Sequence, residues 1–305
     1  MPESTPAPPT ASEEALLTPE FLAKLDRLEL ASKRIVQGRL QGERRSRRKG
    51  SSVEFADYRN YSVGDDLRRI DWNIYSRLEK LFLKLFLEEE DLRVHTLIDT
   101  SLSMNFGKPT KLLFAKKIAA ALSYIGMVHH DRVSVETFAA SLEQGGPGPL
   151  RSKSQIHRLL HYLESIPSSG SSDITSAAKA FATRNIGPGV VVVVSDFLDK
   201  NGYETALRYL VARNFEVYVI HVLSEEEVNP PQTGDLRLVD SEDGDFAEIT
   251  ITAPMLERYK RTVEAFKDGL RDWCGKRGIH YTFTTSDAPF ERLVLEYMRR
   301  NGLVR

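Results

Sequence analysis

The chain has 305 residues, of which 41% are hydrophobic and 28% charged, close to the averages of soluble globular proteins. Its 42 lysines and arginines balance 43 acidic residues, which excludes an overall field that would steer it to nucleic acid or membrane. Cys274 is the only cysteine, so an intramolecular disulfide is excluded and a reducing compartment fits. The longest apolar run, Val190 to Val194, is far shorter than the roughly 20 residues of a membrane-spanning helix, and the start lacks a secretory pattern. We expect a cytoplasmic protein.

The amino-terminal part of the chain is predicted to hold a tail and an extension. Residues 1–17 are rich in Pro, Ser, Thr and Glu at their start, which is typical of a disordered tail. Residues 18–91 form an N-terminal extension, with a helix predicted from Thr18 to Leu40 and a strand from Leu81 to Leu87. Arg44 to Lys49 is almost continuously basic. We favour a solvated loop there over an anion or nucleic-acid contact.

Residues 92–305 alternate between short apolar strands and amphipathic helices, the pattern of a mostly parallel α/β sheet flanked by helices. We expect strands at residues 93–98, 132–138, 190–195, 216–222 and 280–284, and helices at residues 111–129, 154–165, 174–184, 203–213, 254–276 and 289–301. Residues 235–252 depart from this alternation and predict an inserted β-hairpin that turns at an acidic, glycine-containing segment.

A polar loop follows the first of these strands. Asp99-Thr100-Ser101-Leu102-Ser103 places a carboxylate and two hydroxyls at alternate positions just beyond the strand's carboxyl end. Open parallel sheets bind their ligands at that edge. A carboxylate with hydroxyls suits a hard divalent cation such as Mg²⁺. The loop therefore predicts part of a metal site.

Two further segments are expected at the same edge of the sheet. Ser169 to Asp173 is a loop of small polar residues that opens a helix, and Asp196 ends the strand of five valines. With the Asp99 loop they bring carboxylates and hydroxyls from three loops, which suits a cation with open coordination positions.

The Asp99 loop resembles the Asp-x-Ser-x-Ser signature of von Willebrand A domains, the metal-ion-dependent adhesion site. Ser172-Asp173-Ile174 is similar to the family's Thr-Asp-Leu, with serine in place of threonine, and Asp196 matches the third motif. The resemblance implies a Rossmann-like fold and a divalent cation, Mg²⁺ or Mn²⁺, whose last coordination position is often filled by a carboxylate of a partner protein. The implied metal ligands are Asp99, Ser101, Ser103, Ser172 and Asp196.

The segment Phe55–Trp72, FADYRNYSVGDDLRRIDW, resembles the hallmark of the bacterial "domain of unknown function 58" family, and Arg77, Lys84 and Glu89 continue it. The resemblance extends over about residues 20–300. Members of that family are similar to von Willebrand A proteins and are typically encoded beside MoxR-type AAA+ ATPases. The resemblance thus implies a MoxR-type ATPase, or a client of it, as the protein partner.

Each motif also has a structural explanation. The hydroxyls of the Asp99 loop would then only cap the following helix. For the charged residues between Asp57 and Trp72 we favour an ion-pair network that joins this segment to the sheet over a functional surface.

From the sequence we expect a non-enzymatic, metal-dependent protein-interaction module with no catalytic residues. One alternative is a metal-dependent phosphoester hydrolase, although the three loops contain no histidine to act as a base. Another is nucleic-acid binding through residues 44–49. The oligomeric state does not follow from the sequence.

Overall fold

The computed structural model describes residues 16–28, 30, 54–63, 65–87, 92–143, 146–185, 188–230, 234–239, 246–297, 299 and 302–304. The chain divides into two compact units, residues 1–33 with 92–305 (unit 1) and residues 34–91 (unit 2). The extension predicted to start at residue 18 is longer than unit 2, because the chain up to residue 33 belongs to unit 1. Of the tail predicted at residues 1–17, only Leu16 and Leu17 are described, and both are buried.

Unit 1 is built on one parallel sheet with the strand order β4-β3-β5-β6-β9. Its strands are β3 (Arg93–Asp99), β4 (Arg132–Phe138), β5 (Gly189–Ser195), β6 (Phe215–Leu223) and β9 (His280–Thr285). All four neighbouring pairs are parallel. Every residue of β5 and β6 is buried, because helices cover both faces of the sheet. The predicted α/β fold, von Willebrand A-like with a Rossmann-like sheet, is confirmed.

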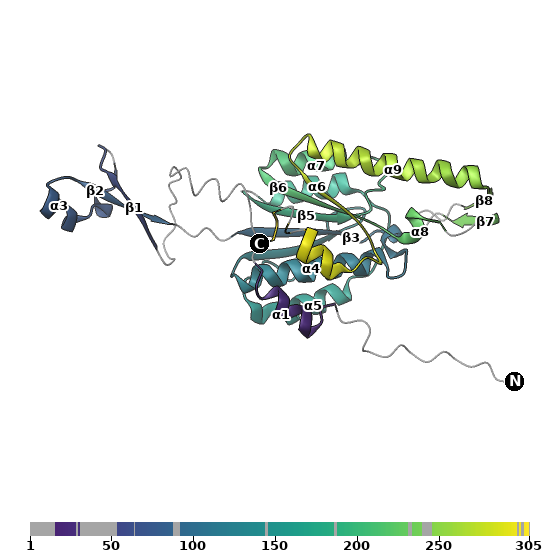
Figure 1. Ribbon diagram of the computed structural model, residues 1–305, viewed down its shortest axis with the longest axis horizontal. Coiled ribbons are helices and arrows are strands. Elements are labelled where there is room, and N and C mark those ends of the chain that lie inside the picture. Colours follow the sequence, from purple (N-terminus) through teal and green to yellow (C-terminus); the bar gives the residue numbers. More distant parts are fainter. Residues whose placement is uncertain are drawn as a thin grey trace. The chain divides into compact units, whose positions relative to one another are not determined.

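Helices lie on both faces of this sheet (Figure 1). One face is covered by α4 (Lys111–Val128), onto which α1 (Pro19–Leu25), α5 (Ile156–Ser165) and the short α10 (Phe290–Arg292) pack. The other face carries α6 (Ile174–Arg184), α7 (Glu204–Ala212) and α9 (Ala253–Gly275). Helices on both faces leave the carboxyl ends of the central strands as the place where loops from different strands meet.

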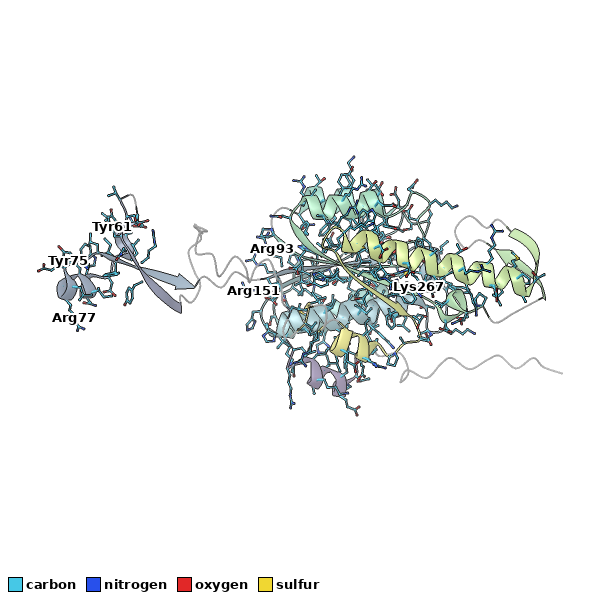
Figure 2. All side chains as sticks on the ribbon, turned by 45° about the horizontal axis from the view of Figure 1, so that its top comes forward. Tyr61, Tyr75, Arg77, Arg93, Arg151 and Lys267 are labelled. Carbon is cyan, nitrogen blue, oxygen red and sulfur yellow. The ribbon has the colours of Figure 1, made fainter. Side chains whose placement is uncertain are left out.

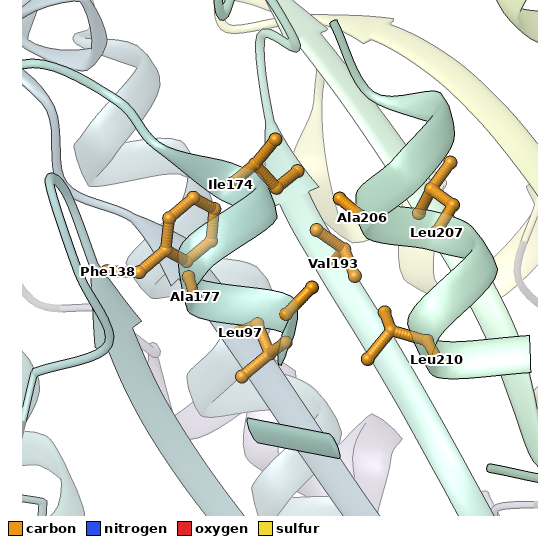
Figure 3. A pocket seen from close by; sticks show the side chains of 9 residues that line it. Leu97, Phe138, Ile174, Ala177, Val193, Ala206, Leu207 and Leu210 are labelled. Atoms are coloured by element: carbon orange, nitrogen blue, oxygen red, sulfur yellow. The ribbon is translucent and has the colours of Figure 1, made fainter. Parts of the chain in front are cut away.

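The core on the second face is a tight apolar layer (Figure 3). Small residues let α6 and α7 approach each other over the sheet, with Ala177 on α6 and Ala206 on α7 facing Val193 of β5. A small pocket remains between them, and its walls are entirely apolar: Leu97, Phe138, Ile174, Ala177, Ala178, Val193, Ala206, Leu207 and Leu210. With no polar group in its lining, this pocket is a packing gap rather than a candidate site.

Two helices differ from their predicted lengths. The first, expected to reach Leu40, begins at Pro19 beneath a Thr18 cap and ends at Leu25. Leu30 then pairs with Val304 in an isolated β-bridge. The last, expected over residues 289–301, consists of α10 followed by a π-helical turn over Leu293–Tyr297. After the first helix, the long-range contact of Leu30 overrides the helical pattern of the sequence.

The predicted hairpin is present as antiparallel strands β7 (Gly234–Val239) and β8 (Phe246–Ile251). It follows α8 (Glu225–Val228), a single helical turn after β6. Among the described residues, no helix is long and apolar enough to cross a membrane.

Unit 2 contains the antiparallel pair β1 (Glu54–Asn60) and β2 (Phe82–Leu87), with a 3₁₀ turn η1 (Leu67–Arg69) and the helix α3 (Trp72–Leu78) between them. Tyr75 and Arg77 project from α3 (Figure 2). Asp71 is 5% exposed and caps α3 through the amides of Asn73 and Ile74. Its other oxygen accepts the Tyr58 hydroxyl at 3.1 Å.

Candidate metal and partner-binding site

The candidate site lies at the carboxyl edge of the sheet, where β3 and β5 end side by side. Asp99 is the last residue of β3 and Ser195 the last of β5, so Asp196 begins the loop next to the Asp99 loop. The Ser172 loop joins them because the amide of Leu102 bonds to the Gly170 carbonyl at 3.0 Å. Parallel pairing thus brings the three predicted loops to one place.

Asp99 is fully buried, and the described residues that bond to its carboxylate are all neutral donors. Oδ2 accepts the Ser195 hydroxyl at 2.7 Å and the Ser172 hydroxyl at 3.2 Å, while Oδ1 accepts the Ser101 amide at 3.0 Å. Burial, together with the nearby Asp196 carboxylate, raises the pKa of Asp99 to about 6. In the described part of the chain no cationic side chain bonds to Asp99, and a buried carboxylate in such surroundings favours a bound cation or a proton.

Asp196 has a different environment. Its Oδ2 accepts the Ser103 hydroxyl at 2.8 Å and the Lys111 ammonium at 2.8 Å. Ser103 Oγ lies 3.1 Å from Ser101 Oγ, and since the single Ser103 proton goes to Asp196, Ser101 is the donor in that contact. Asp196 is therefore linked through the two serines to the Asp99 loop.

Lys111 is a fully buried cation at this site. Its ammonium lies 2.8 Å from Asp196 and 2.6 Å from Oε1 of Glu227, on α8. Burial alone would lower the pKa of Lys111, but the Asp196 and Glu227 carboxylates outweigh it and the net direction is upward. Lys111 therefore stays charged.

The loop after β5 is held in an unusual conformation. Phe197 is buried and has a φ of 57°, a left-handed conformation that is costly for a bulky residue. Its amide donates to Ser195 Oγ at 2.9 Å, and the Leu198 amide donates to Asp196 Oδ1 at 3.2 Å. The strained turn thus fixes the Asp196 side chain against the Ser103 and Lys111 donors.

The structure brings all five predicted ligand residues into one hydrogen-bonded cluster: Asp99, Ser101, Ser103, Ser172 and Asp196. That they bind a metal stays a prediction. Three further residues, Ser195, Lys111 and Glu227, touch this cluster and were not predicted from the sequence. Lys111 carried one available signal, because a cation in the first turn of a helix opposes the helix dipole and needs another reason to be there.

The donor set of the cluster fits a hard divalent cation. The hydroxyl protons of Ser172, Ser101 and Ser103 are used as donors toward a carboxylate or another hydroxyl, which leaves oxygen lone pairs as acceptors. Together with Glu227 and Lys111, which touch the cluster, the site has three carboxylates and one ammonium and thus two negative charges. Within the described residues no three His, Cys, Asp or Glu side chains form a metal-binding group, so a cation here would rely on these hydroxyls.

The cluster does not behave as a set of simple helix caps. Ser101 precedes the 3₁₀ turn η2 (Leu102–Asn105) but makes no side-chain capping bond, and α4 is capped by Thr110. The capping explanation holds for Asp173, which accepts the Ser176 amide at the start of α6. The hydroxyls of Ser101 and Ser103 therefore have a different role.

Several of the other charged or reactive groups singled out from the sequence have structural partners. In unit 2, Arg59 pairs with Asp65 at 2.8 Å, and Asp66 caps η1. Burial raises the pKa of the Cys274 thiol to about 12, which removes it as a nucleophile at neutral pH. The basic residues 44–49 lie outside the described residues.

The sheet and its edge define a von Willebrand A-like protein, and comparison with known families makes the assignment narrower. The chain belongs to the family described as "protein of unknown function DUF58", whose pattern matches residues 57–268, more than half of the chain. Uncharacterized proteins of Mycobacterium bovis and Mycobacterium tuberculosis are 27% identical over 265 residues, which cover 85% of this chain and 83% of each relative. The family named from the Phe55–Trp72 segment is thus confirmed.

Solved structures with a similar fold are more distant in sequence. The conserved hypothetical protein BatB of Bacteroides thetaiotaomicron is 18% identical, with a TM-score of 0.42 over 69% of this chain and 98% of that one. An aerotolerance-related membrane protein of Bacteroides fragilis is 19% identical, with a TM-score of 0.44 over 68% and 99%. The SpRpn10 VWA domain is 12% identical, with a TM-score of 0.37 over 67% and 94%.

Proposed function

We propose that this protein is a non-enzymatic interaction module that binds a partner protein through a divalent cation, Mg²⁺ or Mn²⁺. Asp99, Ser101, Ser103 and Ser172 would hold the cation, with Asp196 beside it. When bound, the cation supplies a Lewis-acidic position that a carboxylate of the partner can occupy. The chain's own residues supply the oxygen ligands and orient them through hydrogen bonds.

One observation carries this proposal. Asp99 is a fully buried carboxylate whose partners in the described part of the chain are neutral donors, while Ser103 and Ser172 from two different loops are partly exposed. The site thus combines a buried anion that favours a cation with hydroxyls that a ligand can reach from solvent. A capping role for the hydroxyls would require neither feature.

The same residues favour binding over hydrolysis. A metal-assisted hydrolase commonly pairs its metal with a general base, and the three loops contain no histidine. His221 of β6 is fully buried, its Nδ1 lies 2.9 Å from the Tyr281 hydroxyl, and burial lowers its pKa to about 3. A base that is enclosed in the core and bonded to a tyrosine cannot reach a substrate at the edge of the sheet.

The partner we propose is a MoxR-type AAA+ ATPase or one of its clients. Support comes from the family to which the chain belongs, through its resemblance at Phe55–Trp72. We further propose that an acidic side chain of this partner reaches the cation.

Metal titration and co-purification test the two parts of the proposal. Wild type should bind one equivalent of Mn²⁺ in calorimetry and retain a MoxR-type ATPase of the same organism in Mg²⁺ but not in EDTA. Asp99→Asn should lose both, whereas Asp272→Asn, which removes the same charge from the exposed face of α9, should lose neither. The proposal would be overturned if Asp99→Asn in EDTA captured as much ATPase as wild type captures in Mg²⁺.

A further inference from the structure

Lys111 occupies a position where a lysine is locally unfavourable. It is the first residue of α4, beneath the Thr110 cap, where the positive end of the helix dipole disfavours a cation. It is also 0% exposed, so its ammonium has lost its hydration. Among the described residues, the Asp196 and Glu227 carboxylates are the groups that compensate for both costs. The ammonium is therefore part of the site rather than part of a solvated helix face.

We propose that Lys111 is a resident cation of the site, which holds Asp196 in place and restricts the divalent cation to the Asp99 side. This inference rests on the proposed metal-dependent function and deepens it. It makes Asp196 a positioning residue instead of a direct metal ligand, and Lys111 the residue that limits the affinity for metal. The site accordingly takes one divalent cation.

The contacts of the two aspartates carry this distinction. Both oxygens of Asp196 are engaged, Oδ2 by Ser103 and Lys111 and Oδ1 by the Leu198 amide. A divalent cation placed on the same Oδ2 would stand against the ammonium, and two cations so close in a buried site repel strongly. The donors that Asp99 has in the described part of the chain are neutral. The divalent cation is therefore expected at Asp99.

Glu227 extends this arrangement to the loop after β6. Its Oε1 bonds to Lys111, and its Oε2 accepts the Ser224 amide at 2.7 Å in a capping box that also bonds the Ser224 hydroxyl to the Glu227 amide. Lys111 thus ties α4, the Asp196 loop and α8 together without any metal. Ion pairs thus hold the Asp196 half of the site, whereas the bonds that the described residues make to the Asp99 carboxylate come from neutral donors, and we expect the divalent cation there.

The first experiment compares two isosteric substitutions by Mn²⁺ calorimetry on the full chain. Asp99→Asn should abolish binding, and Asp196→Asn should weaken it by no more than about tenfold, because it removes a nearby charge but no direct ligand. Asp196→Asn keeps the Lys111–Glu227 pair, so its fold is expected to persist. Loss of Mn²⁺ binding by Asp196→Asn to the same extent as Asp99→Asn, with an unchanged circular dichroism spectrum, would overturn the inference.

The second experiment changes the resident cation itself. Lys111→Met should tighten Mn²⁺ binding about tenfold or more, because a positive charge that opposes the metal is gone. Its midpoint of urea unfolding should fall in EDTA and recover in Mn²⁺. The double variant Lys111→Met/Glu227→Gln has the cluster charge of wild type and should return to near wild-type affinity. An unchanged affinity in folded Lys111→Met would overturn the inference.

The outcomes separate this inference from the proposed function. If wild type binds no Mn²⁺, the metal-dependent function fails and this inference fails with it. If wild type binds Mn²⁺ and Asp99→Asn does not, the metal site stands, and the Asp196→Asn and Lys111→Met results decide the role of Lys111 alone. If Lys111→Met does not fold, the comparison of Asp99→Asn with Asp196→Asn still decides whether Asp196 is a positioning residue or a direct metal ligand.

Discussion

The Ser195 hydroxyl donates to Oδ2 of Asp99 across 2.7 Å, joining the ends of two neighbouring parallel strands. Both residues are buried, and Ser195 Oγ also accepts the amide of Phe197. One hydroxyl therefore supports the carboxylate on which the proposed metal site depends and the strained turn that positions Asp196.

Ser195→Ala is expected to lower the free energy of unfolding in EDTA by about 1.5–3 kcal/mol, because the buried Asp99 carboxylate loses a charged hydrogen bond. In the Asp99→Asn background the same substitution should cost less, since the bond then involves no charge. Urea unfolding measures the loss of unfolding free energy in each background, and hydrogen exchange of the β3 and β5 amides shows whether the loss is local to these strands.

Ser165→Ala on the exposed end of α5 is the matched control and should change stability by less than about 0.5 kcal/mol. Equal costs of Ser195→Ala in the wild-type and Asp99→Asn backgrounds would show that Ser195 acts through packing alone.

The extent to which sequence predicts this site depends on how local each interaction is. Asp99, Ser101 and Ser103 share one loop, and Ser172 and Asp196 follow from the rule that parallel strands end at one edge. Ser195 could not be predicted in this way, and the place of Lys111 in the first turn of a helix signals an unusual lysine without indicating which groups it contacts. A lysine at a helix start is usually solvated, and a serine that ends a buried strand has many structural uses, so their roles depend on tertiary packing.

In the fold too, features set by local sequence are predictable and features set by long-range contacts are not. The strands of the sheet follow from apolar runs that both faces bury, such as the five valines of β5. The early end of α1 was not predictable, because the segment after Leu25 keeps apolar residues at helical spacing. Leu30 instead pairs with Val304, almost the whole chain away. No local pattern indicates such a contact.

His95 is expected to make the stability of unit 1 depend on pH. Burial, with Arg93 and Arg184 nearby, lowers the pKa of its imidazole to about 4. Unfolded histidine titrates near 6.5, so below that pH the unfolded state gains a proton that the folded state refuses until about pH 4. Stability present above pH 6.5 is therefore lost as pH falls, by up to about 1.4 kcal/mol per pH unit.

His95→Gln should make this dependence shallower between pH 6.5 and 4.5, as measured by urea unfolding at each pH. The buried His221, whose pKa is also lowered, to about 3, keeps contributing in both proteins. His157→Gln on the exposed surface of α5 should leave the dependence unchanged. A slope for His95→Gln that equals that of wild type would contradict the assignment of the effect to His95.

Asp71 is expected to hold the hallmark segment of unit 2 together. It caps α3 and accepts the Tyr58 hydroxyl of β1, so Asp71→Ala should destabilise this helix by about 1–2 kcal/mol. Asp71→Asn keeps a capping oxygen and should cost much less. Hydrogen exchange of the amides of Asn73 to Leu78 measures the difference. Asp66→Ala, which removes the cap of the three-residue turn η1, serves as the comparison.

Gly126 and Gly269 are both helical glycines, and the space around them predicts opposite effects of alanine. A Cβ on Gly126 of α4 would lie 2.5 Å from Val133 Cγ1 and 3.1 Å from Leu30 Cδ1, whereas one on Gly269 of α9 meets nothing within 4 Å. Gly126→Ala should therefore destabilise the protein by about 1–3 kcal/mol through overpacking. Gly269→Ala should stabilise it by about 0.5–1 kcal/mol through helix propensity.

A second substitution tests whether steric overlap causes the Gly126→Ala effect. Val133→Ala removes the methyl group that the new Cβ would meet, so the double variant should be more stable than the sum of the two single costs predicts. Thermal unfolding of the four proteins gives the coupling energy. Simple additivity would mean that Gly126 is required for a reason other than its approach to Val133. A coupling of about 1 kcal/mol or more would place the contact between α4 and β4 as the cause.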